Sequence, residues 1–94
     1  MKDRNDVIPL LHSLKNPTFF TRDEDYYSRD LIHAHYCLVY LDVPPGESAR
    51  HIFRFLRDRR FRNNSDRVGR VLRLRQKKLS YYELKVDLER HLSW

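Results

Sequence analysis

The chain has 94 residues, of which 40% are hydrophobic and 34% are charged, and its formal net charge is +6. This length predicts one small basic domain over residues 1–94, and the apolar content with only two glycines argues against disorder. Cys37 has no second cysteine for a disulfide, and the N-terminus has no apolar run long enough for a signal peptide or a membrane span. We therefore expect an intracellular protein, in the cytoplasm or nucleus, that does not bind membranes.

The basic residues are concentrated in the middle of the sequence. Residues 50–78 contain twelve of the nineteen arginine and lysine residues but only two acids, Asp58 and Asp66. Residues 1–49 contain five basic and eight acidic residues instead. Because like charges repel, this segregation is typical of a surface that an anionic partner neutralises.

The first expected element is a short helix that Asp6 can cap and that ends at Asn16-Pro17. Pro9 is tolerated because it falls in the first turn. The apolar residues of this helix recur at helical spacing: Val7, Leu10, Leu11 and Leu14.

A second helix is predicted from near Arg22 to Leu41. Thr21 and Glu24 form a capping box ahead of it, and its apolar line ends in a run that is apolar on every side. The segment 35–43 has an alternative interpretation as a buried strand, because it is rich in aromatic and β-branched residues.

A third helix is predicted over residues 48–62, after the break at Pro44-Pro45-Gly46 and with Ser48 as its N-cap. The inner stripe is expected to contain Ala49, Ile52, Phe53 and Leu56. The outer stripe is expected to contain Arg50, Arg54 and Arg57.

Two further helices are predicted, over residues 66–78 and 81–93. Ser65 can cap the first, although Gly69 weakens it and the alternation of leucine with arginine also permits a strand at 68–75. Ser80 and Glu83 form a capping box for the last helix. Its expected buried face contains Tyr81, Leu84, Leu88 and Leu92. The predicted fold class is therefore mainly α, a compact bundle of about five short helices, with α+β containing a strand at 35–43 as the alternative.

The basic segment predicts a nucleic-acid-binding surface. Ten of its twelve basic residues are arginine, whose planar guanidinium forms paired hydrogen bonds with phosphate and with guanine edges. Phe55 and Phe61 are candidates for base stacking, whereas Phe53 is assigned to the core by its spacing. The candidate nucleic-acid-binding residues are Arg50, Arg54, Arg57, Arg59, Arg60, Arg62, Arg67, Arg70, Arg73, Arg75, Lys77 and Lys78.

Two patterns contain residue types that bind metals or take part in catalysis. His33, His35 and Cys37 alternate and would share one face of a strand, but no second pair of metal ligands stands at a familiar spacing. Asp66 with Glu83-x-Lys85 resembles a magnesium-dependent nuclease pairing, yet acids in the first turns of helices have a simpler explanation in the helix dipole. We expect no metal site, no cofactor and no catalysis.

The expected function is that of a regulatory or accessory protein that binds nucleic acid, DNA or RNA not distinguished, through the arginines of the third and fourth helices. The alternative is a protein-interaction module or inhibitor whose basic face docks on an acidic partner. An in-plane membrane helix using Phe53, Phe55 and Phe61 is disfavoured because that helix is needed for the core. A homodimer, through exposed aromatic residues, would double the basic face.

Overall fold

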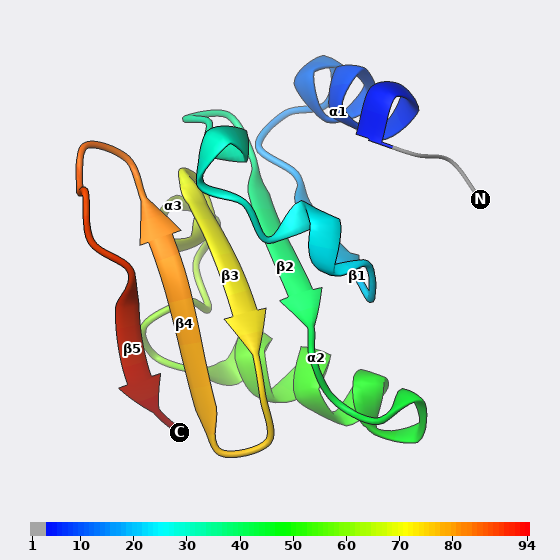
Figure 1. Cartoon of the computed structure of the whole chain (residues 1–94), viewed down its shortest axis with the longest axis vertical. Helices are drawn as coiled ribbons and strands as arrows, with labels where there is room; N and C mark the ends of the chain where they lie inside the picture. The colour runs from blue at the N-terminus through cyan, green and yellow to red at the C-terminus, as the bar shows by residue number, and fades with distance from the viewer. Residues whose placement is uncertain (1–3) are drawn as a thin grey trace.

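The structure is a computed structural model that describes residues 4–94, with the side chains of residues 7–94, and its centre is a five-stranded sheet (Figure 1). The strands are β1 (Thr18–Thr21), β2 (Cys37–Leu41), β3 (Arg70–Leu74), β4 (Lys78–Glu83) and β5 (Arg90–Ser93). They lie in sequence order across the sheet; β1, β2 and β3 are parallel, and β4 runs antiparallel to both β3 and β5. The architecture is therefore α+β with a mixed sheet.

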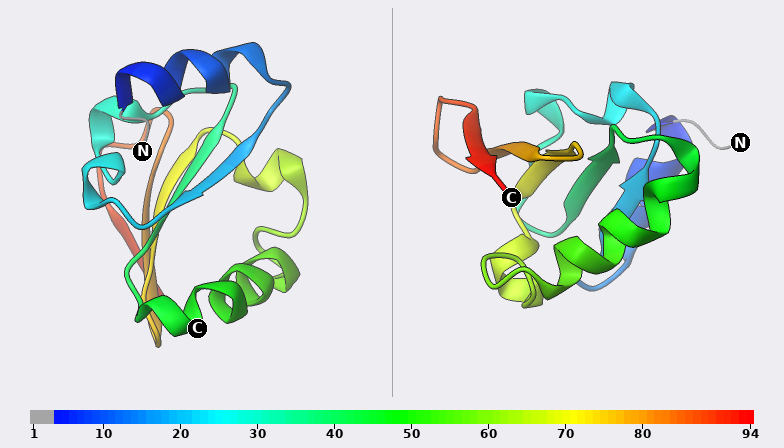
Figure 2. Two further views of the ribbon diagram at one scale, coloured as in Figure 1. Left: turned by 90° about the vertical axis from the view of Figure 1, so that its right-hand side faces the viewer. Right: turned by 90° about the horizontal axis from the view of Figure 1, so that it is seen from below.

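Short helices lie on both sides of this sheet (Figure 2). The α-helices are α1 (Arg4–Ser13), α2 (Ser48–Arg57) and α3 (Asn64–Arg67). The 3-10 helices are η1 (Glu24–Tyr26), η2 (Arg29–Leu31) and η3 (Pro45–Glu47). Among the described residues, no helix is long and apolar enough to cross a membrane.

Strand alternation divides the core into two layers, one on each face of the sheet. Towards α2, the side chains of Val39 and Leu41 from β2 pack with Leu72 and Leu74 from β3 and with Phe55 from α2. On the other face, the intervening residues of the same strands pack with α1, η1 and η2. The buried members of that second layer are Val7, Leu11, Tyr26, Leu31, Tyr36, Leu38 and Val71.

The predicted helical bundle is wrong, and so is the description of the domain as helical. The predicted fourth helix, 66–78, is replaced by the single turn α3 and by strand β3, and the predicted last helix, 81–93, by β4, a loop and β5. The reason is that Leu72 and Leu74 alternate with Arg73 and Arg75, which fits the period of two of a strand. In the sheet they have neighbours on both sides, which an isolated helix would not provide.

The predicted second helix, 22–41, is also wrong, and the alternative strand at 35–43 matches β2. Residues 22–36 form η1, η2 and loops instead. At the expected capping box, the Thr21 hydroxyl accepts a bond from the Asp23 amide, and the Asp23 carboxylate accepts one from the Asp25 amide. These two hydrogen bonds therefore stabilise the start of the 3-10 helix η1 and do not begin an α-helix.

Helices were found where they were expected at two places. The first begins at Arg4, two residues before the expected cap Asp6, whose side chain lies outside the described residues. Its buried residues are Val7 and Leu11, whereas Leu10 and Leu14 are about half exposed. The predicted third helix is α2, which ends at Arg57 instead of continuing to residue 62.

Gly69 explains why the fourth predicted helix stops after one turn. Its φ is +84°, a conformation that residues with a side chain rarely adopt, and its amide donates to the Tyr36 carbonyl at 2.9 Å. A Cβ at this position would lie 3.1 Å from Cδ1 of Leu84. The chain turns here from α3 into β3.

The sheet assignment predicts opposite outcomes for two leucines, one buried in β4 and one exposed in the loop that replaces the predicted last helix. Leu79 in β4 is 1% exposed, whereas Leu88, in the loop before β5, is 72% exposed. Leu79→Ala should lower the free energy of unfolding by about 2–4 kcal/mol because it leaves a cavity. Leu88→Ala should change it by less than about 0.5 kcal/mol. Urea unfolding of both variants measures the difference, and a large loss for Leu88→Ala would restore the helical interpretation.

Candidate functional site

The outer face of α2 is basic and has an aromatic ring at its centre. Arg50, Phe53, Arg54 and Arg57 are all exposed and lie three or four residues apart, so they are neighbours on one side of the helix. Together with Asp58 they line a shallow surface hollow. We call these four residues the α2 basic face.

Phe53 was assigned to the core, and that assignment is wrong. It is 59% exposed, whereas Phe55 is fully buried and Phe61 is 1% exposed. The inner stripe of α2 instead contains His51 and Phe55, with Ile52 and Leu56 partly buried beside them. The stripe is therefore rotated from the predicted one. The pair His51 and Phe55, which lie one turn apart, could have indicated the inner face of α2 from the sequence. The predicted stripe did not include them because histidine was not expected in the core.

Arg54 is held in place by contacts outside the helix. Its guanidinium lies 4.3 Å from the centre of the Trp94 ring, and Nη1 donates to the Gln76 carbonyl at 3.2 Å. The Trp94 indole is fixed in turn, because Nε1 donates to the Arg75 carbonyl at 2.8 Å. This arginine is therefore ordered before any ligand arrives, which lowers the entropy cost of using it.

The loop after α2 extends the basic surface. Asp58 accepts two bonds from Arg60, from Nε at 3.0 Å and from Nη2 at 2.8 Å. Arg57, Arg59 and Arg62 are exposed, and within the described part of the chain their side chains form no ion pair or hydrogen bond. Their charges remain available to a partner.

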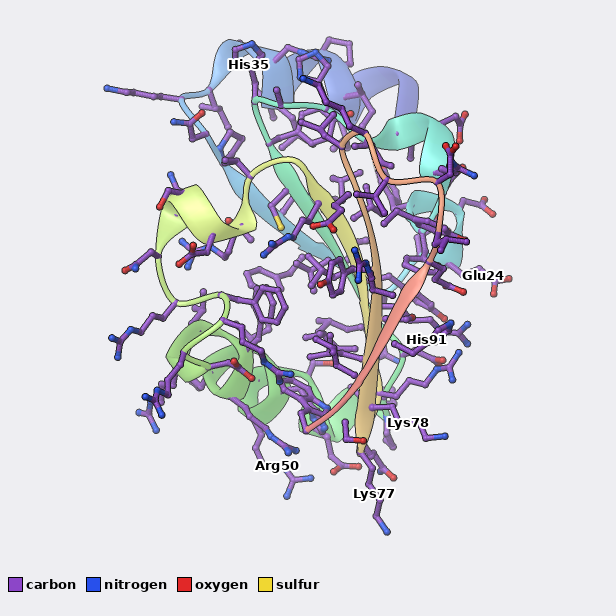
Figure 3. The ribbon with its side chains drawn as sticks, turned by 90° about the vertical axis from the view of Figure 1, so that its left-hand side faces the viewer. Glu24, His35, Arg50, Lys77, Lys78 and His91 are labelled. Carbon is purple, nitrogen blue, oxygen red and sulfur yellow. The ribbon has the colours of Figure 1, made fainter. Side chains whose placement is uncertain are left out.

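The β3–β4 turn brings two lysines to the same end of the molecule. Figure 3 shows Lys77 and Lys78 projecting from this turn near Arg50. Arg50 forms an ion pair with Glu47, and Gln76 donates to the other Glu47 oxygen at 2.9 Å. The turn and the start of α2 are therefore bound to each other through Glu47.

Two of the predicted site arginines have structural partners beside α3. Arg67 donates from Nη1 to two loop carbonyls at 2.9 Å and from Nε to the Thr18 hydroxyl at 3.0 Å. Arg70 lies 3.4 Å from the Glu83 carboxylate and 5.4 Å and 5.2 Å from the ring centres of Phe61 and Tyr81. Both side chains connect the loop after α2 to the sheet.

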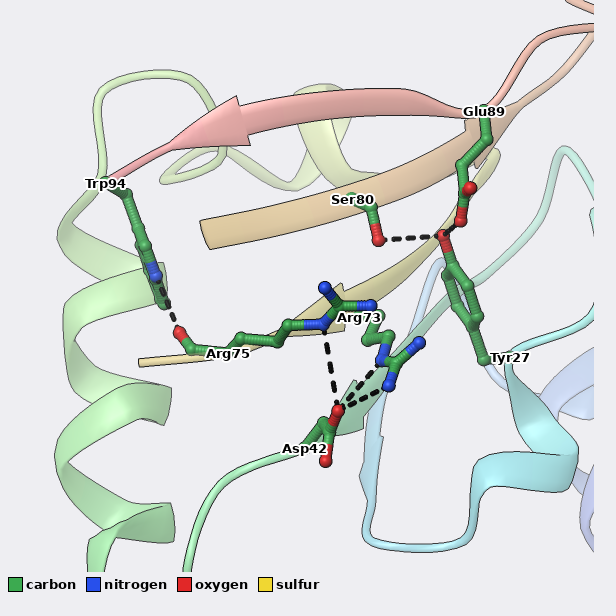
Figure 4. Close-up of polar contacts among 7 residues, drawn as sticks. All are labelled: Tyr27, Asp42, Arg73, Arg75, Ser80, Glu89 and Trp94. Atoms are coloured by element: carbon green, nitrogen blue, oxygen red, sulfur yellow. Dashed lines mark hydrogen bonds and ion pairs between the residues drawn. The ribbon is translucent and has the colours of Figure 1, made fainter. Parts of the chain in front are cut away.

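Two more of the predicted site arginines, Arg73 and Arg75, lie on the other face of the sheet, near Asp42 (Figure 4). Arg73 donates to the Asp42 carboxylate from Nη2 at 2.6 Å and from Nε at 2.9 Å, and Arg75 Nε lies 3.7 Å from it. Arg73 also lies 5.7 Å from the Tyr40 ring centre. The predicted single face formed by a third and a fourth helix is therefore absent, because Arg70 lies on the α2 side of the sheet and Arg73 and Arg75 lie on the opposite side.

The twelve predicted site residues thus separate into two groups. Eight are exposed: Arg50, Arg54, Arg57, Arg59, Arg60, Arg62, Lys77 and Lys78. Four are partly buried: Arg67, Arg70, Arg73 and Arg75. The structure brings the six exposed arginines together on α2 and its following loop, with Asp58 as the one acid between residues 48 and 62.

Acidic residues lie on the side of the sheet away from α2. Glu24 and Asp25 of η1 line a polar hollow with Tyr27, Tyr40 and Arg73. In Figure 3, where the sheet is seen nearly edge-on, Glu24 projects on the side opposite α2. The acids of η1 and the arginines of α2 therefore lie on opposite sides of the sheet.

Tyr27 connects the acidic side to the last two strands (Figure 4). Its hydroxyl donates to the Glu89 carboxylate and lies 3.0 Å from the Ser80 Oγ. Burial, followed by the bond to Glu89, raises the pKa of Tyr27 well above its ordinary value. This phenol stays protonated and acts as a structural donor.

Neither of the two chemical patterns forms a site with metal-binding geometry. His33 lies against His12 and His35, with ring centres 4.3 Å and 5.0 Å apart, whereas Cys37 is buried in β2, where burial raises the pKa of its thiol to about 12. Among the described residues, no group of three His, Cys, Asp or Glu side chains could hold a metal ion.

The nuclease-like pattern is only partly assembled. Asp66 and Glu83 line one small hollow, but Arg70 lies in it as well. The Glu83 carboxylate is 3.4 Å from Arg70 and 3.7 Å from Arg90. The Glu83 carboxylate, which would have to bind the cation, is therefore paired with two guanidinium groups instead.

Comparisons with known proteins found no matching family model, curated sequence or solved structure.

The ion pair between Asp58 and Arg60 predicts a pH-dependent contribution to stability. The side-chain hydrogen bonds from Arg60 hold the pKa of Asp58 below its ordinary value of 3.8. A lowered pKa stabilises the fold above 3.8, and that stability is lost as the pH falls through the pKa of the folded state. Asp58→Asn should therefore be less stable than the parent at neutral pH, and the gap should close in acid. Urea unfolding between about pH 7 and about pH 2 measures it. A gap independent of pH would contradict the electrostatic origin.

Proposed function

We propose that the protein is a nucleic-acid-binding regulatory or accessory protein whose binding surface is the α2 basic face and the loop after it. The observation that supports this most strongly is the arrangement of Arg50, Arg54 and Arg57 around an exposed aromatic ring on one side of a helix. Guanidinium groups bind phosphate oxygens with paired hydrogen bonds. An intracellular location and the absence of catalysis belong to the same proposal.

The distribution of charge supports phosphate as the ligand. Residues 48–62 contain six arginines and one acid, whereas four of the eight acids of residues 1–49 lie in or beside η1 and η2: Asp23, Glu24, Asp25 and Asp30. A strand of phosphates that approached from the acidic side would be repelled, and one that approached α2 would be attracted. The fold therefore gives the molecule one electrostatically favourable orientation on a polyanion.

The same distribution predicts which arginines bind. Arg67, Arg70 and Arg73 already donate hydrogen bonds to groups of this chain, and Arg75 forms an ion pair with Asp42, so their replacement should affect stability more than affinity. Arg57, Arg59 and Arg62 have no such partner among the described residues. Binding energy should come from this second group, with Arg50, Arg54, Lys77 and Lys78 beside it.

A salt series on matched variants tests the proposal. Arg57→Ala should weaken binding to duplex DNA and reduce the slope of log K against log salt by about 0.9, the value for one lost phosphate contact. Its matched control is Arg29→Ala, which removes the same charge from η2, on the other side of the sheet, where Arg29 pairs with Asp87. That control should retain the parent slope. Because phosphate contacts carry no base information, the loss for Arg57→Ala should be the same on unrelated sequences.

Two results would overturn the proposal. Equal losses for Arg57→Ala and Arg29→Ala would mean that net charge alone drives a diffuse attraction. Parent affinity weaker than the non-specific range of about 10⁻⁴ to 10⁻⁶ M, together with a partner recovered from nuclease-treated lysate, would favour an acidic protein as the ligand.

A further inference from the structure

We propose that Phe53 is a stacking platform for an unpaired base, so that the α2 basic face prefers single-stranded to duplex nucleic acid. This inference rests on the function proposed above and adds the class of ligand. The Phe53 ring is 59% exposed. Phe55, two positions along the same helix, is fully buried.

The fold does not require an apolar residue at position 53. The inner stripe of α2 is complete without it, because His51, Ile52, Phe55 and Leu56 supply the contacts to the sheet. The other large exposed apolar residues lie on α1, just after it or in the β4–β5 loop, and are leucines: Leu10, Leu14, Leu84 and Leu88. Phe53 is the one aromatic residue among those exposed large hydrophobics of the described chain.

The arginines around Phe53 are placed to hold the strand that carries such a base. Arg50 lies one turn before the ring and Arg57 one turn after it, so they are about 10 Å apart along the helix at about 1.5 Å per residue. All three side chains line the same hollow. A strand that follows the helix axis would place one base over Phe53 and phosphates beside Arg50 and Arg57.

The preference for unpaired strands follows from the chemistry of stacking. Every base has an aromatic face, but in a duplex both faces already stack on neighbouring base pairs. A ring on the convex surface of a helix can therefore reach a base face only where the strand is unpaired. Charge complementarity with the arginines selects a polyanion over a neutral apolar partner.

The test uses the full chain and four probes: a pyrimidine oligonucleotide of about 12 nucleotides as DNA and as RNA, its DNA duplex, and a DNA strand with abasic sites in place of the bases. The parent should bind the single strands more tightly than the duplex and the abasic strand. Phe53→Leu, which keeps an apolar side chain but removes the ring, should lower single-strand affinity by about 5- to 150-fold, the range for one stacked base. It should leave duplex and abasic-strand affinity unchanged.

Two further variants make the result specific to the ring. Phe53→Trp should retain the single-strand preference, because it restores an aromatic face. Phe53→Leu should leave the slope of log K against log salt unchanged, whereas Arg57→Ala should reduce it by about 0.7 on a single strand. Circular dichroism and thermal unfolding should show both Phe53 variants folded, as expected for an exposed side chain.

The possible results separate the two proposals. If Phe53→Leu binds single strands as the parent does while Arg57→Ala is weakened, the stacking inference fails and nucleic-acid binding stands. The same holds if Phe53→Leu weakens duplex and single-strand binding equally. If the parent binds none of the four probes beyond the non-specific range, the proposed function fails and the stacking inference with it.

Discussion

Parallel pairing of β2 with β3 is the constraint on which the rest of the molecule depends. The register Leu38↔Val71 and Val39↔Leu72 places two fully or almost fully buried side chains opposite each other on each face of the sheet. A slip by one residue would turn every side chain of a strand to the other face. The pairing therefore fixes which face α2 covers and which face is left to α1, η1 and η2.

The charge separation follows from that arrangement. The two connections between parallel strands have different compositions: the one from β1 to β2 is acid-rich and contains η1 and η2, and the one from β2 to β3 is arginine-rich and contains α2. Because they lie on opposite faces, a segregation of charge along the sequence becomes a segregation across the sheet (Figure 2). Asp42 then neutralises the basic residues that β3 directs to the acidic side, chiefly Arg73.

Only local features of the fold could be predicted from the sequence. The helix over Ser48–Arg57 follows a proline-glycine break, so its start at Ser48 was predicted correctly, although its end and its inner face were not. Strand β3 could not be separated from a helix in this way, because the sequence around Leu72 and Leu74 permits both and the β2 residues that pair with them, Val39 and Leu41, are more than thirty positions away. Ser80 and Glu83 have the spacing of a capping box, but both lie in strand β4.

The sequence predicted that the basic surface is rich in arginine, but it could not show which arginines belong to that surface. A count of charges finds residues 50–78, but it cannot show that Arg67 is bound to Thr18 or that Arg70 lies beside Glu83. The sequence also could not show that Phe53 is exposed. A shift of the apolar stripe by one residue around α2 exchanges a core position for an exposed one. The exposed ring and its neighbouring arginines became visible only once the contacts of α2 with the sheet were known.

We propose that nucleic acid binds to this protein on the α2 side of the sheet. An NMR titration of the ¹⁵N-labelled chain with a single-stranded oligonucleotide tests it most directly, because it reports every backbone amide at once. Chemical-shift changes should concentrate on residues 48–62 and on the β3–β4 turn, and η1 and η2 should be unaffected. Shifts centred on residues 23–31, or spread evenly over both faces, would contradict the claim.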